Sequence, residues 1–184
     1  SITDTLKNVE NYFNDPNLVS NSSFFLPYLS GERTPHNDPH IRGSFHAMKT
    51  TTDATNMQYA VIEGVSFGIL DGVNSILKVN DNFEKIFMVG GGSKSSFWIE
   101  LLSSLLNRNL SVCDQSEYGA ALGVARLAMY ADENIENKND IIKEIKISKK
   151  YLPKLKKMDA LMKRYVIWQE LYSTNKQIAP SLII

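Results

Sequence analysis

The stretch that decides the fold is Lys85-Ile86-Phe87-Met88-Val89-Gly90-Gly91-Gly92-Ser93-Lys94-Ser95-Ser96-Phe97-Trp98. Its first part, 85–89, is short, mostly apolar and prone to β structure, which predicts a buried strand. The three glycines that follow allow the backbone to turn sharply and to approach another molecule closely. The serines at positions 93, 95 and 96 can each cap the start of a helix over 95–106.

A strand, a glycine turn and a helix start place free backbone N–H groups and the positive end of a helix at one edge of a sheet. Such a place suits a phosphate, a ribose or one face of a nucleotide. The candidate nucleotide-binding residues are therefore Gly90, Gly91, Gly92, Ser93 and Ser96. A tight turn without a ligand fits the same local pattern, so both interpretations stay open at this point.

The segments on either side of this stretch complete an α/β pattern. Residues 24–28 and 110–113 predict strands, while 54–77 and 154–174 predict helices. Glycines at 64, 68 and 72 mark one ridge of the helix 54–77, and we expect a neighbouring helix to pack closely there. The helix 117–131 has small, apolar side chains on nearly all of its faces, which predicts that it is buried. The polar residues 132–150 predict a surface connection.

Composition and charge exclude several classes of function. The 20 basic and 20 acidic residues of the 184-residue chain balance, so no general attraction to nucleic acid or to an anionic membrane is expected. The one cysteine, Cys113, cannot form a disulfide within the chain, which fits a cytoplasmic protein. We expect no signal peptide and no apolar run long enough to span a bilayer.

A long loop over 30–43 contains the other candidate residues. It is rich in proline, glycine and turn-forming residues, and loops of this length are often functional. Arg33 and Arg42 can each bind a carboxylate or a phosphate. Alternatively, Glu32 and Arg33 tie the loop to its own domain. The histidines at 36, 40 and 46 predict no metal site, because prolines at 35 and 39 prevent the helix that would align the first two.

Several motifs in this order resemble the FGGY carbohydrate kinases, and most of all their xylulokinase branch. The stretch 25–35, with the Asp-Pro pair at 38–39 and the Arg-Gly pair at 42–43, is similar to that branch's form of the family motif. The glycine stretch with Trp98 resembles the adenine-side loop, and 117–123 resembles the closing helix. A second family signature is matched by Gly43, Phe45, Asn56, Met57, Ala60 and Glu63. One position departs from it, because Ala47 stands where the family usually has glycine.

The resemblance implies an α/β domain of the actin-like ATPase (ribonuclease H-like) kind, with a mixed sheet flanked by helices. It implies ATP-dependent phosphorylation of a ketopentose, D-xylulose foremost, with Mg²⁺ neutralising the phosphates. This chain would supply the adenine and ribose side of the nucleotide site. A loop with Glu32, Arg33 and Thr34 would lie at the cleft. ATP, ADP and the sugar are the expected partners, and a homodimer stays open.

The same resemblance implies that the chain is most of the second of two domains. We expect a truncated segment at 1–21, the domain core at 22–131, a charged connection at 132–150 and a terminal helix and tail at 151–184. The family's catalytic base and first phosphate loop have no match here. The base is therefore expected upstream, and the isolated chain is expected to be inactive.

Two other functions are weighed against the kinase. The first is an NAD-type dinucleotide-binding domain of an oxidoreductase, with Asp114 as the ribose-binding acid. Ser95 stands where that fingerprint needs its third glycine. A Walker loop fails too, since no glycine directly precedes Lys94. The second is a scaffold or oligomerisation domain without catalysis.

Overall fold

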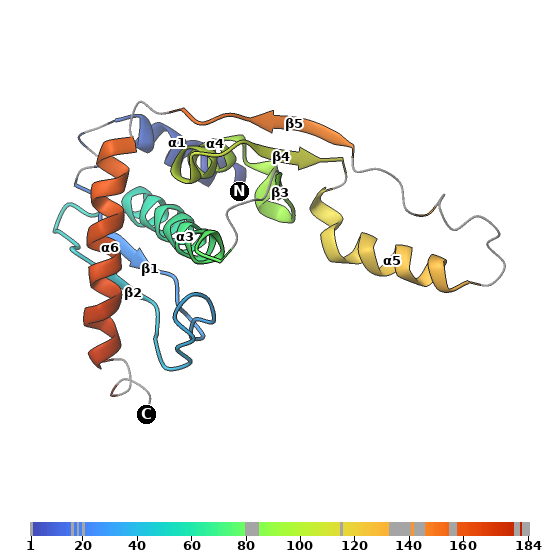
Figure 1. Ribbon diagram of the computed structural model, residues 1–184. Coiled ribbons are helices and arrows are strands. Elements are labelled where there is room, and N and C mark those ends of the chain that lie inside the picture. Colours follow the sequence, from blue (N-terminus) through green and yellow to red (C-terminus); the bar gives the residue numbers. More distant parts are fainter. Residues whose placement is uncertain are drawn as a thin grey trace.

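The computed structural model describes residues 2–15, 17, 19, 21–79, 85–114, 116–132, 141, 146–154, 158–178 and 181 (Figure 1). Its helices and strands follow the predicted α/β pattern, and every predicted strand and helix is present with ends shifted by a few residues. The elements are α1 (Ile2–Asn14), β1 (Phe24–Leu26), β2 (Ser44–His46), α3 (Ala54–Leu77), β3 (Ile86–Met88), η1 (Gly91–Lys94), α4 (Ser96–Leu106), β4 (Leu110–Cys113), η2 (Ser116–Tyr118), α5 (Gly119–Ala131), β5 (Ile147–Tyr151) and α6 (Met158–Ile178).

The strands form two sheets. β3 pairs with β4 in parallel, and β4 pairs with β5 antiparallel, so this sheet is mixed as expected. β1 and β2 form a separate antiparallel pair. The strand β5 lies partly inside the predicted connection 132–150, and sequence reasoning missed it. All its residues except Tyr151 are exposed, so it lacks the apolar pattern by which a strand is recognised.

α3 is the central helix of the structure, with α1, α4, α6 and β1 packed around it (Figure 1). Its buried aromatic residues Tyr59 and Phe67 belong to one hydrophobic cluster with Val9 and Tyr12 of α1 and Trp168 of α6. The side chain of Asp53 caps its start by accepting a hydrogen bond from the N–H of Asn56, at 2.8 Å.

The length and composition of α3 also meet the criteria for a membrane-spanning helix, so the expectation that no run is long enough was too strong. Buried core helices of globular proteins pass the same test, and α3 packs on four other elements. Its buried residues include the charged Glu63 and Asp71. The position of α3 is that of a core helix.

The element that packs on the glycine ridge of α3 is a strand, β1, and not the helix that the glycine spacing predicted. A Cβ built on Gly64 would lie 2.1 Å from the carbonyl oxygen of Phe25 in β1. Gly68 has only Pro27 nearby, and Gly72 has nothing within 4 Å. Only the first glycine of the series is therefore required by close packing.

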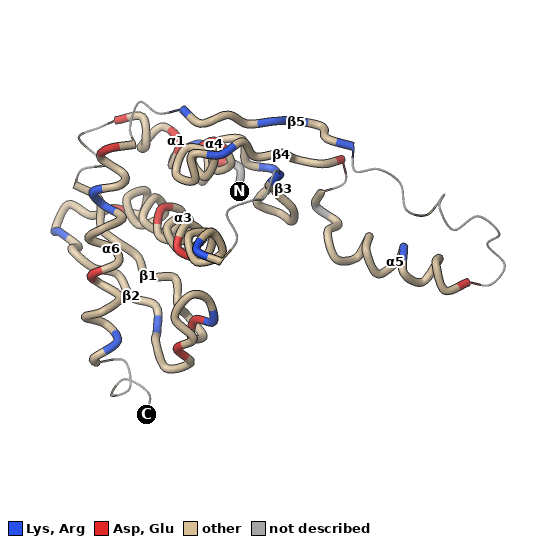
Figure 2. Tube along the Cα trace, in the orientation of Figure 1, with Lys and Arg blue, Asp and Glu red and all other residues tan. Residues whose placement is uncertain are grey.

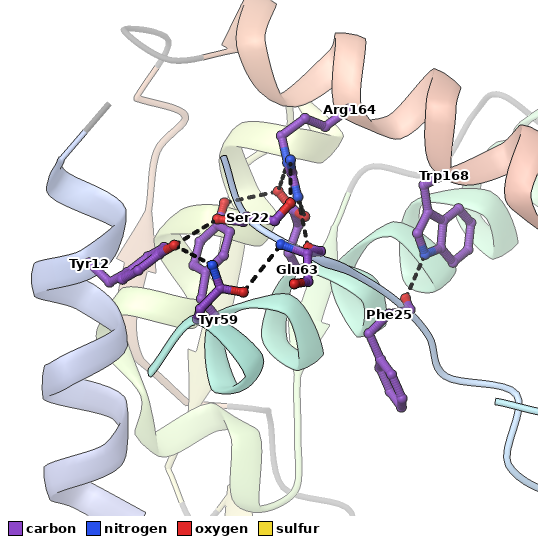
Figure 3. A network of polar contacts seen from close by, with 9 residues as sticks. Tyr12, Ser22, Phe25, Tyr59, Glu63, Arg164 and Trp168 are labelled. Carbon is purple, nitrogen blue, oxygen red and sulfur yellow. Dashed lines mark hydrogen bonds and ion pairs between the residues drawn. The ribbon is translucent and has the colours of Figure 1, made fainter. Parts of the chain in front are cut away.

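A buried ion pair joins α3 to α6 (Figure 3). The Nε and Nη2 atoms of Arg164 donate to the two carboxylate oxygens of Glu63, both at 2.7 Å. The hydroxyl of Tyr59 donates to the same carboxylate, at 2.9 Å. Arg164 also donates to the backbone carbonyls of Ser22 and Ser23, just before β1. One guanidinium therefore connects two helices and the start of a strand.

Burial and charge pairing have opposite effects on the pKa values of Glu63 and Arg164. Burial raises the pKa of the Glu63 carboxyl, while the hydrogen bonds and charge of Arg164 act to lower it. Burial acts to lower the pKa of Arg164, but the hydrogen bond and charge of Glu63 raise it above its ordinary value. The guanidinium is thus kept charged, and each group depends on the other for compensation.

The helix α5 does not pack as the sequence suggested. None of its 13 residues is buried, although we predicted a buried helix. It extends away from the other elements in Figure 1, and Figure 2 shows it almost without charged residues. Ser116, three residues before α5, shares a hydrogen bond with Ser93, at 2.9 Å. The apolar composition of α5 therefore has no matching cover in the described part of the chain.

Alanine substitutions on the ridge of α3 should have opposite effects. We expect Gly64→Ala to lower the free energy of unfolding by about 1–3 kcal/mol, because its Cβ would overlap the Phe25 carbonyl. Gly72→Ala should raise it by up to about 1 kcal/mol, because alanine has the higher helix propensity and meets no neighbour. Urea denaturation measures both. Equal effects of the two changes would contradict the assignment of β1 as the packing partner.

Removing the guanidinium should be far more costly than removing an exposed cation. Arg164→Met leaves Glu63 buried and without its cationic partner, and we expect the free energy of unfolding to fall by about 3–5 kcal/mol. The control is Lys154→Met, which breaks the exposed pair with Glu100 and should cost at most about 1 kcal/mol. In the variant, folded Glu63 has an even higher pKa, so the folded state binds more protons than the unfolded one. The deficit should therefore shrink as the pH falls from 8 towards 5.

Candidate functional site

The glycine stretch forms a tight turn between β3 and α4. Gly90 has a φ of 82°, in the region that favours glycine, and its N–H donates to the carbonyl of Ser116, at 2.8 Å. The buried Ser93 donates its hydroxyl back to the carbonyl of Gly90, at 2.7 Å. Gly90 and Ser93 therefore build the turn and tie it to η2.

The other predicted residues face a cavity of about 790 Å³. Gly91, Gly92 and Ser96 line one side of this cavity, and Leu6, Lys7 and Glu10 of α1 line the other. A Cβ on Gly91 would meet nothing within 4 Å, whereas a Cβ on Gly92 would lie 2.9 Å from the ring of Trp98. The backbone at Gly91 is thus open to the cavity, and that at Gly92 is covered by an aromatic side chain.

The start of α4 is held in place from several directions. Ser95, one of the three cap candidates, caps the helix by accepting a hydrogen bond from the N–H of Trp98, at 3.2 Å. The ring nitrogen of Trp98 donates to the hydroxyl of Ser66 in α3, at 2.9 Å. Ser96 lies within hydrogen-bond distance of the hydroxyl of Tyr151 in β5, at 3.0 Å. The N-terminus of α4 is therefore fixed against both a helix and the sheet.

The lining of this cavity suits a ligand with an apolar part and a polar end. The first N–H groups of η1 and α4 lack acceptors within their own helices, and they favour a negative group nearby. Ile62, Phe97 and Trp98 contribute apolar walls, and the charged lining residues are the basic Lys7 and Lys94 and the acidic Glu10. Sequence reasoning missed the α1 side of this cavity, because α1 carries no motif and its position is set only by tertiary packing.

The cleft-loop candidates lie elsewhere, in the segment between β1 and β2. The carboxylate of Glu32 accepts hydrogen bonds from the N–H groups of Thr34 and His36, at 2.7 and 2.9 Å. Arg42 donates to the carbonyls of Pro39 and Ile41. Glu32 and Arg42 thus organise their own loop. Arg33 and Thr34 are exposed, and neither lines the cavity of the glycine turn.

Asp38 is the buried anchor of the same loop. It accepts hydrogen bonds from the N–H groups of His40 and Ile41 and from the hydroxyl of Tyr172 in α6. Although burial acts to raise it, these bonds keep the pKa of Asp38 below its ordinary value. A second bond from α6, between the Asn175 amide and the Arg42 carbonyl, has a length of 2.9 Å. The loop is therefore attached to α6 by two hydrogen bonds.

Within the described residues, no three histidine, cysteine, aspartate or glutamate side chains come together as a metal site would require. His36 stacks on the ring of Tyr172, with centroids 3.6 Å apart, and lies 3.5 Å from a carboxylate oxygen of Asp71. His46 shares a hydrogen bond with Ser44, at 2.7 Å. These contacts give both histidines packing roles.

Comparison with known proteins decides the family. The family model described as "FGGY family of carbohydrate kinases, C-terminal domain" matches residues 6–131. The chain belongs to the FGGY carbohydrate kinase family. The match starts within α1, while the proposed division into 1–21, 22–131, 132–150 and 151–184 stays a prediction. The family assignment also leaves the alternative of an NAD-type domain without support.

Individual relatives point the same way. The chain is 30% identical over 149 residues to the xylulose kinase of Escherichia coli, covering 81% of this chain and 31% of that protein. The solved ligand-bound xylulose kinase of Lactobacillus acidophilus has a TM-score of 0.71 at 28% identity, covering 95% of this chain and 34% of that one. The gluconate kinase of the same organism has a TM-score of 0.72 at 27% identity, covering 98% and 35%.

The chain spans about a third of the length of the curated relatives it matches. The structural neighbours confirm the α/β fold of this family that the motifs predicted. They do not separate one sugar from another, since kinases named for xylulose and for gluconate are equally similar in structure.

Proposed function

We propose that this chain is the nucleotide-side part of a sugar kinase that transfers the γ-phosphate of ATP to a ketopentose. The observation that carries the proposal is the cavity lined by Gly91, Gly92 and Ser96 within an FGGY C-terminal domain. The apolar walls suit an adenine, and the open backbone at Gly91 allows a ribose or phosphate to come close. D-xylulose is the proposed sugar, because the curated relatives reported above are named for it. The reaction would serve pentose catabolism in the cytoplasm.

Phosphoryl transfer depends mainly on positioning and on electrostatic stabilisation. In our proposal the glycine turn and the start of α4 position the nucleotide, and Gly90 and Ser93 hold the turn in shape. Mg²⁺ would neutralise the phosphates when bound. The described residues offer no cluster of three metal ligands, so we propose that phosphates, water and groups outside this chain hold the ion. Glu32 would shape the proposed cleft loop, and Arg33 and Thr34 would be its free groups.

Direct titration of the 184-residue chain tests the nucleotide assignment. We expect ATP, and not NAD, to give saturable binding by calorimetry. Binding of NAD alone, or of neither nucleotide, would overturn the proposal.

The chain by itself should not phosphorylate xylulose. A general base is typically worth about 10²- to 10⁴-fold in rate, and we propose that it lies in the part of the kinase outside this third. A coupled assay of ADP release measures this. The comparison is a kinase-length chimera in which residues 1–184 replace the matching third of the Escherichia coli xylulose kinase. Rapid xylulose-dependent ADP release by the chain alone would contradict the assignment of the base.

A side chain at Gly91 should obstruct the nucleotide. Because a Cβ there meets no atom within 4 Å, Gly91→Val should leave the melting temperature unchanged. In the chimera it should raise the KM for ATP by about tenfold or more, equivalent to about 1.4 kcal/mol, with little change in the KM for the sugar.

The matched control is Gly90→Val. It forces a β-branched residue to a φ of 82° and should lower the melting temperature. If Gly91→Val lowers the melting temperature while its ATP KM stays normal, the glycine is structural and the cavity is not the nucleotide site.

A further inference from the structure

Ser66 of α3 is a fully buried polar residue that lies outside every family motif found in the chain. The described residues that line the cavity of the glycine turn do not include it. Its hydroxyl donates to the carbonyl of Ile62, at 2.7 Å, and accepts a hydrogen bond from the ring nitrogen of Trp98, at 2.9 Å. Because a hydroxyl has a single proton, the bond to Ile62 uses that proton and leaves the oxygen lone pairs for the indole.

The indole of Trp98 is held along two edges. A Cβ on Gly92 would lie 2.9 Å from Cζ3 and 3.3 Å from Cε3, so the six-membered ring lies over the backbone of the glycine turn. The nitrogen of the five-membered ring is bound to Ser66. The χ2 torsion of an aromatic side chain has only broad preferences of its own. These two contacts therefore decide the orientation of a ring that forms one wall of the cavity.

We infer that Ser66 is a positioning residue for the nucleotide and that it acts through the indole of Trp98. This role rests on the proposed nucleotide site, because Trp98 lines the same cavity as Gly91 and Gly92. A side chain whose orientation is fixed before the ligand arrives loses little conformational freedom on binding, and affinity rises accordingly. Ser66 lies behind the cavity wall, so a change at this residue reaches the nucleotide through Trp98.

The alternative is that the bond only helps to hold α3 and α4 together. These two helices already share one apolar cluster, to which α3 contributes Tyr59 and Phe67 and α4 contributes Phe97 and Leu101. The bond from Trp98 adds one polar contact to that packing. Its distinctive effect is to fix the direction of the indole nitrogen, and that direction matters for a ligand in the cavity.

Calorimetric titration of the 184-residue chain with ATP tests this role. Ser66→Ala removes the acceptor of the indole and should weaken ATP binding by about 3- to 10-fold, as expected for one hydrogen bond. In a Trp98→Phe background, which has no ring nitrogen, Ser66→Ala should change the Kd for ATP by less than about 1.5-fold. This cycle is preferable to Ser66→Thr, because an added methyl group would disturb packing at a fully buried position.

Ser75→Ala is the matched control. Ser75 also lies in α3, and its hydroxyl donates to the carbonyl of Asp71, four residues earlier, at 3.0 Å. It is likewise absent from the described lining of the cavity. Ser75→Ala should therefore leave the Kd for ATP unchanged.

Tryptophan fluorescence gives a readout that a purely structural bond would not change. Of the two tryptophans in the chain, Trp168 is fully buried and Trp98 is partly exposed, so quenching by acrylamide reports mainly on Trp98. We expect ATP to protect Trp98 from acrylamide. Ser66→Ala should increase the quenching of the ATP-free chain, because the indole is then released on one edge.

The outcomes separate the role of Ser66 from the proposed function. If ATP binds but Ser66→Ala leaves the Kd unchanged, or weakens binding equally in the Trp98→Phe background, the inference is wrong and the nucleotide site still stands. Binding of ATP without protection of Trp98 would also overturn the inference alone. If the unaltered chain does not bind ATP, both the nucleotide site and the role of Ser66 are overturned.

Discussion

The buried pair between Glu63 and Arg164 is the constraint on which the rest of the structure depends. Removing a carboxylate from water is costly, and here the two guanidinium bonds and the Tyr59 hydroxyl compensate for it. The same guanidinium binds the carbonyls of Ser22 and Ser23. The pair therefore fixes α6, the entry to β1 and the middle of α3 in one arrangement. The family model ends at residue 131, so this part of the domain's stability comes from a helix outside the matched region.

From this point α6 continues along the segment that leads from β1 to β2. After Arg164, Trp168 donates to the carbonyl of Phe25, at 2.8 Å. Tyr172 then binds Asp38, and Asn175 binds the carbonyl of Arg42. These residues are spaced three or four apart, so one face of α6 meets successive parts of the segment. Regular secondary structure is largely replaced in this loop by side-chain hydrogen bonds: Glu32 and Arg42 bind within the loop, and Asp38 and the Arg42 carbonyl bind α6.

Local patterns in the sequence predicted the elements well, and tertiary contacts decided what the patterns left open. The glycine stretch, the helix 54–77 and the strand 110–113 are all found where they were expected. The spacing of Gly64, Gly68 and Gly72 indicated close packing, but only coordinates show that the neighbour is the backbone of β1. Ala47 has a φ of 57°, so the turn needs the left-handed region in which glycine is the common residue. The family motif, and not the chain's own chemistry, marked that position.

The candidate site was less predictable, because its two halves come from distant parts of the chain. The motif indicated Gly90–Gly92, but it could not show that Gly90 is structural while Gly91 faces a cavity completed by α1. Burial of α5 was predicted from its apolar composition, and none of its residues is buried. Composition indicates that a helix favours an apolar partner surface, but it does not show whether this chain provides that surface. The glycine turn is joined through Ser93 and Ser116 to η2, the element just before α5. The shape of the turn therefore depends on its bonds to η2 as well as on the glycines themselves, and a glycine motif alone does not reveal those bonds.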